Sequence, residues 1–145
     1  MKGFTEKRFV EPVEVGPYEK ERLFGLVREI LSSRNDKIIL AYVHGSFIKS
    51  KSFRDIDVGL FVEGKGDFYL ESDISVELTS ALGFEVEARI INDATVAFQM
   101  AVIRDGIPLF CRDEAKRVDF TENISKRYRE YVHFRNFFLE VDGVR

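Results

Sequence analysis

The sequence lacks both disulfide-forming cysteine pairs and long apolar runs. Its one cysteine, Cys111, cannot form an intrachain disulfide, which favours a reducing, cytoplasmic setting. We expect Cys111 to be a small buried apolar residue rather than a reactive thiol. The longest apolar run, 38–43, has six residues, whereas a membrane-spanning helix needs roughly 20. The sequence therefore predicts no membrane segment.

Repeats, low-complexity tracts and Pro/Gly/Ser-rich linkers are also absent, so we expect residues 1–145 to form a single domain. Hydrophobic residues make up 45% and charged residues 32%, which is typical of a soluble globular protein. The net charge of −3 gives no signal for nucleic-acid binding. Residues 1–16 form an N-terminal extension to which the sequence assigns no defined secondary structure. Pro12 argues against a central strand there.

Four segments have the apolar spacing of amphipathic helices. Their approximate bounds are 18–34, 67–82, 94–104 and the long stretch from about 113. We expect Asn92 or Asp93 to cap the third helix. The residues expected on its core face are Val96, Ala97, Met100 and Ile103.

Four further segments are predicted to be strands: 37–44, 55–62, 84–91 and 107–111. The first is almost wholly apolar, as in a strand covered on both faces. Pro108 should confine the last strand to a sheet edge, because proline cannot donate a hydrogen bond to a neighbour. Since strands alternate with helices, the sequence predicts an α/β fold.

Gly45 and Ser46 follow the first strand, at the kind of strand end where ligands of such sheets collect. Asp55 and Asp57 share one face of the next strand, so their carboxylates come within about 5 Å, where repulsion is roughly 3 kcal/mol at a dielectric near 20. Magnesium would neutralise this pair, since it binds one or two carboxylates together with substrate phosphates. The equally weighted alternative is ion pairing with a basic neighbour: Lys49, Lys51 or Arg54.

A third acid is available on the following strand, where Glu85 and Glu87 share a face. Three carboxylates on adjacent strands would hold two cations, which stabilise the attacking and leaving oxygens in phosphoryl-type transfer. The alternative is that Arg89, on the same face, pairs with one of the glutamates at the surface.

The sequence resembles the minimal nucleotidyltransferases (MNT), a branch of the polymerase-beta-like nucleotidyltransferase superfamily. Gly45 and Ser46 match the Gly-Ser pair of the family. Asp55 and Asp57, in the stretch RDIDVGLFV, match its Asp-x-Asp motif, and Glu87, in EVEARIINDA, takes the place of its third acid.

The resemblance runs from about residue 23 to 131, with three departures from the family pattern. The loop between Ser46 and Asp55 has eight residues where ten are usual, and it lacks the family glycine. Glu87 replaces the usual aspartate, which lengthens the side chain by one methylene. These departures keep open a noncatalytic antitoxin, or a regulatory nucleotide-binding module, that retains the fold without transfer activity.

The resemblance implies a small mixed β-sheet flanked by helices and a magnesium-dependent enzyme that transfers AMP from ATP and releases pyrophosphate. MNT proteins act as antitoxins of HEPN-domain partners, some by adenylylating the toxin. A HEPN-type toxin is therefore the expected acceptor, with a small molecule or an RNA end as alternatives. The fourteen phenylalanines favour an apolar partner surface and leave the oligomeric state open.

The resemblance also implies roles for the matching residues. Gly45 and Ser46 would hold the triphosphate, while Asp55 and Asp57 would bind magnesium. Glu87 would serve as a further ligand, completing a site for two ions, or as a general base. Position in the loop adds two expected phosphate contacts, Lys49 and Lys51.

Overall fold

The computed structural model describes residues 11–34 and 37–141, so most of the N-terminal extension lies outside the described residues. Five helices and six strands are present within these ranges. In chain order they are β1 (Val13–Glu14), α1 (Pro17–Ser33), β2 (Ile38–His44), α2 (Ser46–Lys49), β3 (Ser52–Phe53), β4 (Ile56–Val62), α3 (Phe68–Leu82), β5 (Val86–Ile90), α4 (Val96–Asp105), β6 (Ile107–Cys111) and α5 (Glu114–Val141).

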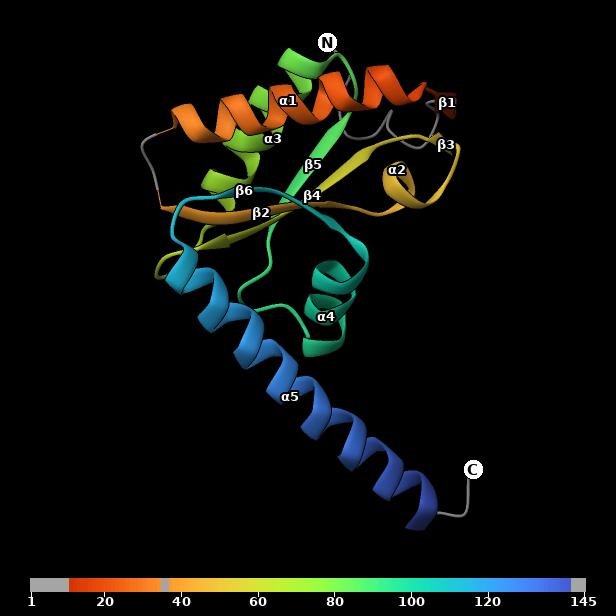
Figure 1. Ribbon diagram of the computed structural model, residues 1–145, viewed down its shortest axis with the longest axis vertical. Helices are drawn as coiled ribbons and strands as arrows, with labels where there is room; N and C mark the ends of the chain where they lie inside the picture. Colours follow the sequence, from red (N-terminus) through yellow and green to blue (C-terminus); the bar gives the residue numbers. More distant parts are fainter. Residues whose placement is uncertain (1–10, 35–36, 142–145) are drawn as a thin grey trace.

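Four strands form a mixed sheet in the order β5-β4-β2-β6 (Figure 1). β2 is antiparallel to β4 and β6, whereas β4 and β5 run parallel. β6 is the edge strand predicted from Pro108, which lies opposite Tyr42. β1 and β3 form a separate two-stranded ribbon. The predicted α/β fold with a small mixed sheet is confirmed.

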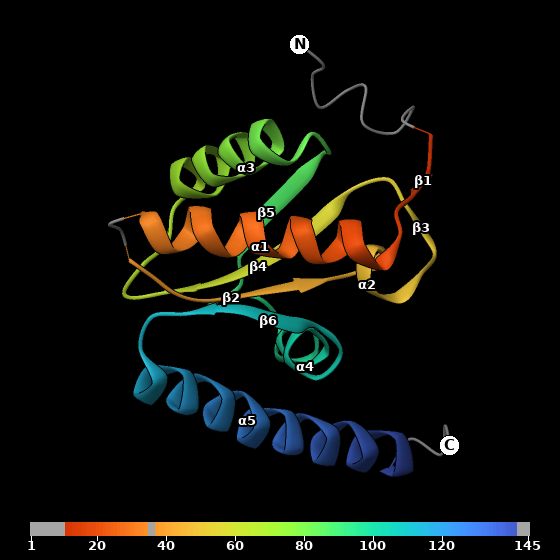
Figure 2. The ribbon, with the colours of Figure 1, turned by 45° about the horizontal axis from the view of Figure 1, so that its top comes forward.

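Helices cover both faces of the four-stranded sheet (Figure 2), with α1 and α3 on one side and α4 and α5 on the other. Each face of the sheet has its own hydrophobic core, and side chains of β4 alternate between the two. Val58 and Leu60 pack with α1 and α3, and Phe61 packs with α4 and α5. β2 is buried along 38–43, as expected of a strand covered on both faces.

Helix α3 positions β5 within the sheet. It begins behind Asp67, whose carboxylate accepts a hydrogen bond from the Leu70 amide at 2.8 Å, and ends at Gly83, where φ is 78°. The buried Ser75 hydroxyl accepts a hydrogen bond from the Ala88 amide at 2.9 Å. This bond ties the helix to the middle of β5.

The segment between Ser46 and Asp55, expected to be a loop, contains α2 and β3. Phe47 and Phe53 are buried and meet edge to face with ring centroids 4.6 Å apart. Such aromatic pairs add to the stability gained from burial. The segment is therefore anchored to the core at two points.

The predicted cap of the third helix is wrong. α4 begins behind Thr95, whose hydroxyl accepts a hydrogen bond from the Phe98 amide at 3.2 Å, rather than behind Asn92 or Asp93. Asn92 instead extends the sheet: its side-chain amide donates to the Val62 carbonyl at 2.8 Å, and its side-chain oxygen accepts from the Val62 amide at 3.0 Å.

The predicted core face of this helix is only partly right. Gln99 and Val102 are its buried residues, whereas Ala97 is exposed. Gln99 is tolerated in the core because its Nε2 donates to the Ile91 carbonyl at 2.7 Å and its Oε1 accepts from Arg127 at 2.8 Å. The predicted residues that do pack against the core, partly buried, are Val96, Met100 and Ile103.

Cys111 is exposed, contrary to the prediction of a buried residue, and it lies at the end of the edge strand β6. Its Sγ lies 3.5 Å from Oε2 of Glu114. Partial desolvation and this hydrogen bond raise the pKa of the Cys111 thiol, which disfavours the reactive thiolate.

Helix α5 crosses α4, and its C-terminal half continues away from the sheet (Figure 1). Several large apolar side chains on this half are exposed: Tyr131, Phe134, Phe137 and Phe138. None of the helices in the described ranges is long and apolar enough to cross a membrane.

Two residues of α3 test the packing of its core face. Leu78 is 0% exposed and Val76 is 57% exposed. We predict that Leu78→Ala lowers the free energy of unfolding by about 2–5 kcal/mol because it leaves a cavity, whereas Val76→Ala changes it by less than about 1 kcal/mol. Urea unfolding followed by circular dichroism measures both. Equal losses for the two variants would contradict the assigned core.

Candidate functional site

The structure brings together the three acids singled out in the sequence. Asp55, Asp57 and Glu87 each offer one carboxylate oxygen, and these oxygens all lie within 4.8 Å of one another. All three side chains are half-buried. The sequence motif therefore corresponds to one compact acidic cluster, while the roles of its members stay a prediction.

Strand pairing explains the cluster. β4 and β5 are parallel neighbours, and their register places Asp57 directly beside Glu87. Glu85, the other candidate, precedes β5 and accepts a hydrogen bond from the Ile56 amide through its carbonyl at 2.9 Å. The additional methylene of Glu87 does not take its carboxylate out of the cluster.

The Gly45 turn lies against this cluster. Gly45 follows β2 with φ 80° and ψ −158°, a positive-φ conformation that residues with side chains rarely adopt. A β-carbon at Gly45 would lie 2.4 Å from Oδ2 of Asp57. Only glycine therefore allows the turn and the Asp57 carboxylate to occupy neighbouring positions. Ser46 follows at the start of α2 with its side chain exposed.

His44, Arg89 and Phe98 form one wall beside the acids. His44 lies opposite Asp57 in the register of β2 with β4. Its ring meets the Phe98 ring edge-on, with centroids 5.7 Å apart. The Arg89 guanidinium stacks over the same ring at 5.4 Å. Burial, followed by the nearby Arg89 charge, lowers the pKa of His44, which favours the neutral imidazole.

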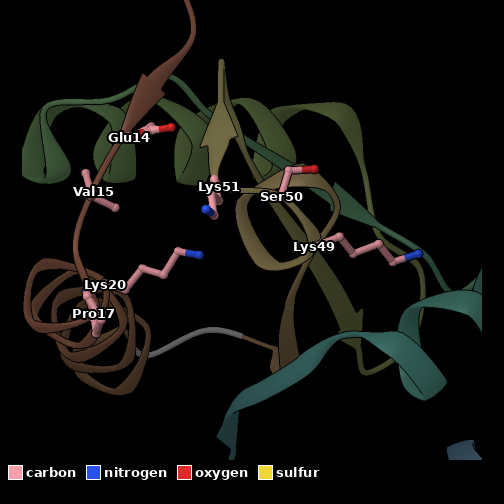
Figure 3. A pocket seen from close by; sticks show the side chains of 7 residues that line it. All are labelled: Glu14, Val15, Pro17, Lys20, Lys49, Ser50 and Lys51. Carbon is pink, nitrogen blue, oxygen red and sulfur yellow. The ribbon is translucent and has the colours of Figure 1, made fainter.

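The two loop lysines lie in different surroundings. Lys49, at the end of α2, has its Nζ 3.5 Å from Oδ2 of Asp105 at the end of α4. Lys51 is exposed and lines a hollow beside α1 (Figure 3). The hollow also contains Lys20, which no sequence motif indicated, because its side chain reaches this place only through the packing of α1 against α2.

The donor set of the cluster fits a hard divalent cation. Three half-buried carboxylates supply only oxygen ligands, as magnesium prefers. The neighbouring Gly45 turn leaves backbone close to the same position, which suits an incoming phosphate. Asp55, Asp57 and Glu87 are thus the residues that could hold the ion.

Residues 27–115 match the family described as Polymerase beta, Nucleotidyltransferase. This range includes the Gly45 turn and all three acids. The chain belongs to this nucleotidyltransferase family.

Solved structures share the fold. A toxin–antitoxin MntA-HepT structure aligns with TM-score 0.65 at 18% identity, covering 83% of this chain and 96% of that chain. The MNT antitoxin in complex with a tri-AMPylated HEPN toxin from Shewanella oneidensis aligns with TM-score 0.66, 18% identity and the same coverage. A toxin–antitoxin structure with AMP-PNP gives TM-score 0.63 and 19% identity, covering 87% of this chain and 97% of that chain. No curated protein matches the sequence well enough to extend this comparison.

Substitution of Gly45 tests the contact between the turn and the acids. Gly64 is the matched control, because its φ is 73° but a β-carbon there would meet nothing within 4 Å. We predict that Gly45→Ala loses about 1–3 kcal/mol of stability, because its φ and ψ lie in a region essentially restricted to glycine, and that Gly64→Ala loses about 1–2 kcal/mol from its positive φ. Only Gly45→Ala should also turn the Asp57 carboxylate away from Asp55 and Glu87. Crystal structures of both variants measure this displacement, and an unmoved Asp57 in Gly45→Ala would contradict the assigned contact.

Proposed function

We propose that the protein is a magnesium-dependent nucleotidyltransferase that transfers AMP from ATP to an acceptor and releases pyrophosphate. The observation that carries this proposal is the convergence of Asp55, Asp57 and Glu87 beside the Gly45 turn. The family assignment supports the reaction class. The AMP-PNP described in one structure of the same fold supports ATP as the donor.

In the proposed reaction, a hydroxyl of the acceptor attacks the α-phosphorus of ATP, and the bond to the bridging oxygen breaks, with its electron pair leaving on pyrophosphate. Magnesium bound to the acids would polarise the phosphate and neutralise its charge. Asp55 and Asp57 would hold the ions, and Glu87 would be a further ligand or accept the hydroxyl proton. Gly45 and the Ser46 hydroxyl would hold the triphosphate, together with Lys49 and Lys51.

We further propose that the acceptor is a HEPN-domain toxin and that the protein is its antitoxin. Two structures of the same fold are described as MntA-HepT and as MNT antitoxin with a tri-AMPylated HEPN toxin. The exposed aromatic residues of α5 support a protein partner, because several large apolar side chains exposed on one half of a helix are typical of an interaction site.

The same aromatic surface favours a second candidate function, a noncatalytic antitoxin that only binds its partner. The exposed aromatic side chains lie on the half of α5 that extends away from the sheet (Figure 1). Binding of a partner to them would therefore not require the acidic cluster. The two functions differ in their dependence on the acids.

Transfer of label from ATP to the partner distinguishes the catalytic antitoxin from the noncatalytic one. Incubation with magnesium, ATP labelled on its α-phosphate and the HEPN partner should label the partner. We predict that the Asp55→Asn, Asp57→Asn double variant lowers the rate by at least about 100-fold, since it removes electrostatic stabilisation of the transferred group. The exposed Asp119 of α5 provides the control Asp119→Asn, which should keep full activity. Undiminished labelling by the double variant would refute the catalytic role of the acids, and partner binding without labelling would favour the noncatalytic antitoxin.

Partner binding tests the α5 surface independently. Phe134 and Phe138 are 60% and 59% exposed, and Phe68 and Tyr69 of α3 are exposed at 75% and 84%. We predict that Phe134→Glu with Phe138→Glu weakens HEPN binding by at least about 30-fold, as for loss of interface hot spots. Phe68→Glu with Tyr69→Glu should leave it unchanged. Calorimetry measures both affinities, and equal effects would argue against α5 as the interface.

A further inference from the structure

A pocket on the α4 side of the sheet lies at the other end of β4 from the acidic cluster. Its volume is about 280 Å³, near the lower end of small-molecule sites, roughly 300–1,000 Å³. Its walls come from the end of β4, the residues that follow β4 and β5, and the helices α4 and α5, so we call it the α4–α5 pocket. β4 runs from β3 toward the start of α5 (Figure 1), and Phe61 in the pocket wall lies four residues beyond Asp57, about 13 Å along the strand. The pocket is therefore separate from the proposed transfer site.

A guanidinium group is held in a fixed position in the wall of this pocket. Arg127 of α5 donates from Nη2 to Oε1 of Gln99 at 2.8 Å and from Nε to Oδ1 of Asn123 at 2.8 Å. Gln99 is 1% exposed, and its Nε2 donates to the carbonyls of Ile91 and Asn92 at 2.7 and 2.9 Å. Because the backbone fixes Gln99, the Arg127 guanidinium is oriented before any ligand binds.

The two bonds leave donors of Arg127 available. A guanidinium carries five N–H donors in a planar fork, and each bond uses one of them. Among the described residues, Nη1 of Arg127 has no hydrogen-bond partner. Such a fork pairs with the two oxygens of a carboxylate or phosphate. Since the Arg127 side chain is only partly exposed, this pairing would be screened less by water than at the open surface.

The remaining lining suits an anion with an apolar body. The exposed Lys65 adds a second positive charge, and Asp93 is the only acid among the described residues that line the pocket. One arginine, one lysine and one aspartate give the lining a formal charge of +1. Apolar contact surface comes from Phe61, Phe120 and Ile124, with the two phenylalanine rings 5.1 Å apart. A charged head and an apolar body thus each find a matching part of the wall.

We propose that the α4–α5 pocket binds a small organic anion, a carboxylate or a phosphate monoester on a compact apolar body. The oxyanion accepts hydrogen bonds from Nη1 of Arg127 and from Lys65, and the apolar body packs against Phe120 and Ile124. None of the described residues that line the pocket belongs to the acidic cluster or to the Gly45 turn, so this site goes beyond the proposed function.

Binding of benzoate and of phenyl phosphate, each followed by NMR titration in EDTA, tests the pocket without metal and without transfer. The two probes share a ring and differ in the oxyanion, so they show whether the site takes a carboxylate, a phosphate or both. We predict that Arg127→Met weakens binding at least about tenfold, the loss expected for one charged hydrogen bond. Arg129, exposed on the same helix and outside the pocket, provides the matched control Arg129→Met, which should bind as the wild type does.

The wild-type spectra locate the ligand even if Arg127→Met fails to fold. Amide signals of Lys65, Asp93, Gln99 and Asn123 should shift on titration, whereas the signal of Gly45 should not. Benzyl alcohol, which has the ring but no charge, should bind at least about tenfold more weakly than benzoate, for want of the charged hydrogen bond.

Three results would overturn the proposal. The first is that the wild type binds neither benzoate nor phenyl phosphate. The second is that the shifted signals lie away from the pocket. The third is that Arg127→Met and Arg129→Met bind equally well, or that benzyl alcohol binds as tightly as benzoate.

Discussion

The parallel pairing of β4 with β5 is the constraint on which the site depends. Because Asp57 lies beside Glu87 in this register, carboxylates from two strands gather at one point. A shift of one residue in the register of β5 against β4 would turn the Glu87 side chain to the opposite face of the sheet and separate it from the two aspartates. Much of the remaining structure holds this register: the Ser75 hydroxyl binds the Ala88 amide of β5, and Asn92 bridges both backbone groups of Val62 at the end of β4.

The turn at Gly45 lies against this strand pair. Its positive-φ backbone and missing side chain make room for the Asp57 carboxylate on one side. On the other side, the buried Phe47 ring packs against Phe24 of α1 and makes a cation–π contact with Lys20. The turn therefore links the acidic cluster to the core that α2 shares with α1.

The strands and the acids could be predicted from sequence because both depend on local patterns. Alternation along the predicted strand 55–62 places Asp55 and Asp57 on one face, and Pro108 identifies the edge strand. The cap at Thr95, the buried Gln99 and the exposed Cys111 could not be predicted, since each depends on packing between distant segments. Lys20 lacks a motif for the same reason: it meets Phe47 only after α1 has packed against α2. The Gly-Ser and Asp-x-Asp motifs indicated the reaction class from sequence. The parallel register of β4 and β5 showed that the Glu87 carboxylate joins the cluster.

The proposed function requires that the three carboxylates bind divalent cations beside the Gly45 turn. A crystal grown with manganese and a nonhydrolysable ATP analogue tests it directly, because anomalous scattering locates the metal without assumptions about activity. We predict an anomalous peak in contact with oxygens of Asp55, Asp57 and Glu87. Full occupancy by the analogue with no peak among these three side chains, or with manganese bound elsewhere, would contradict it.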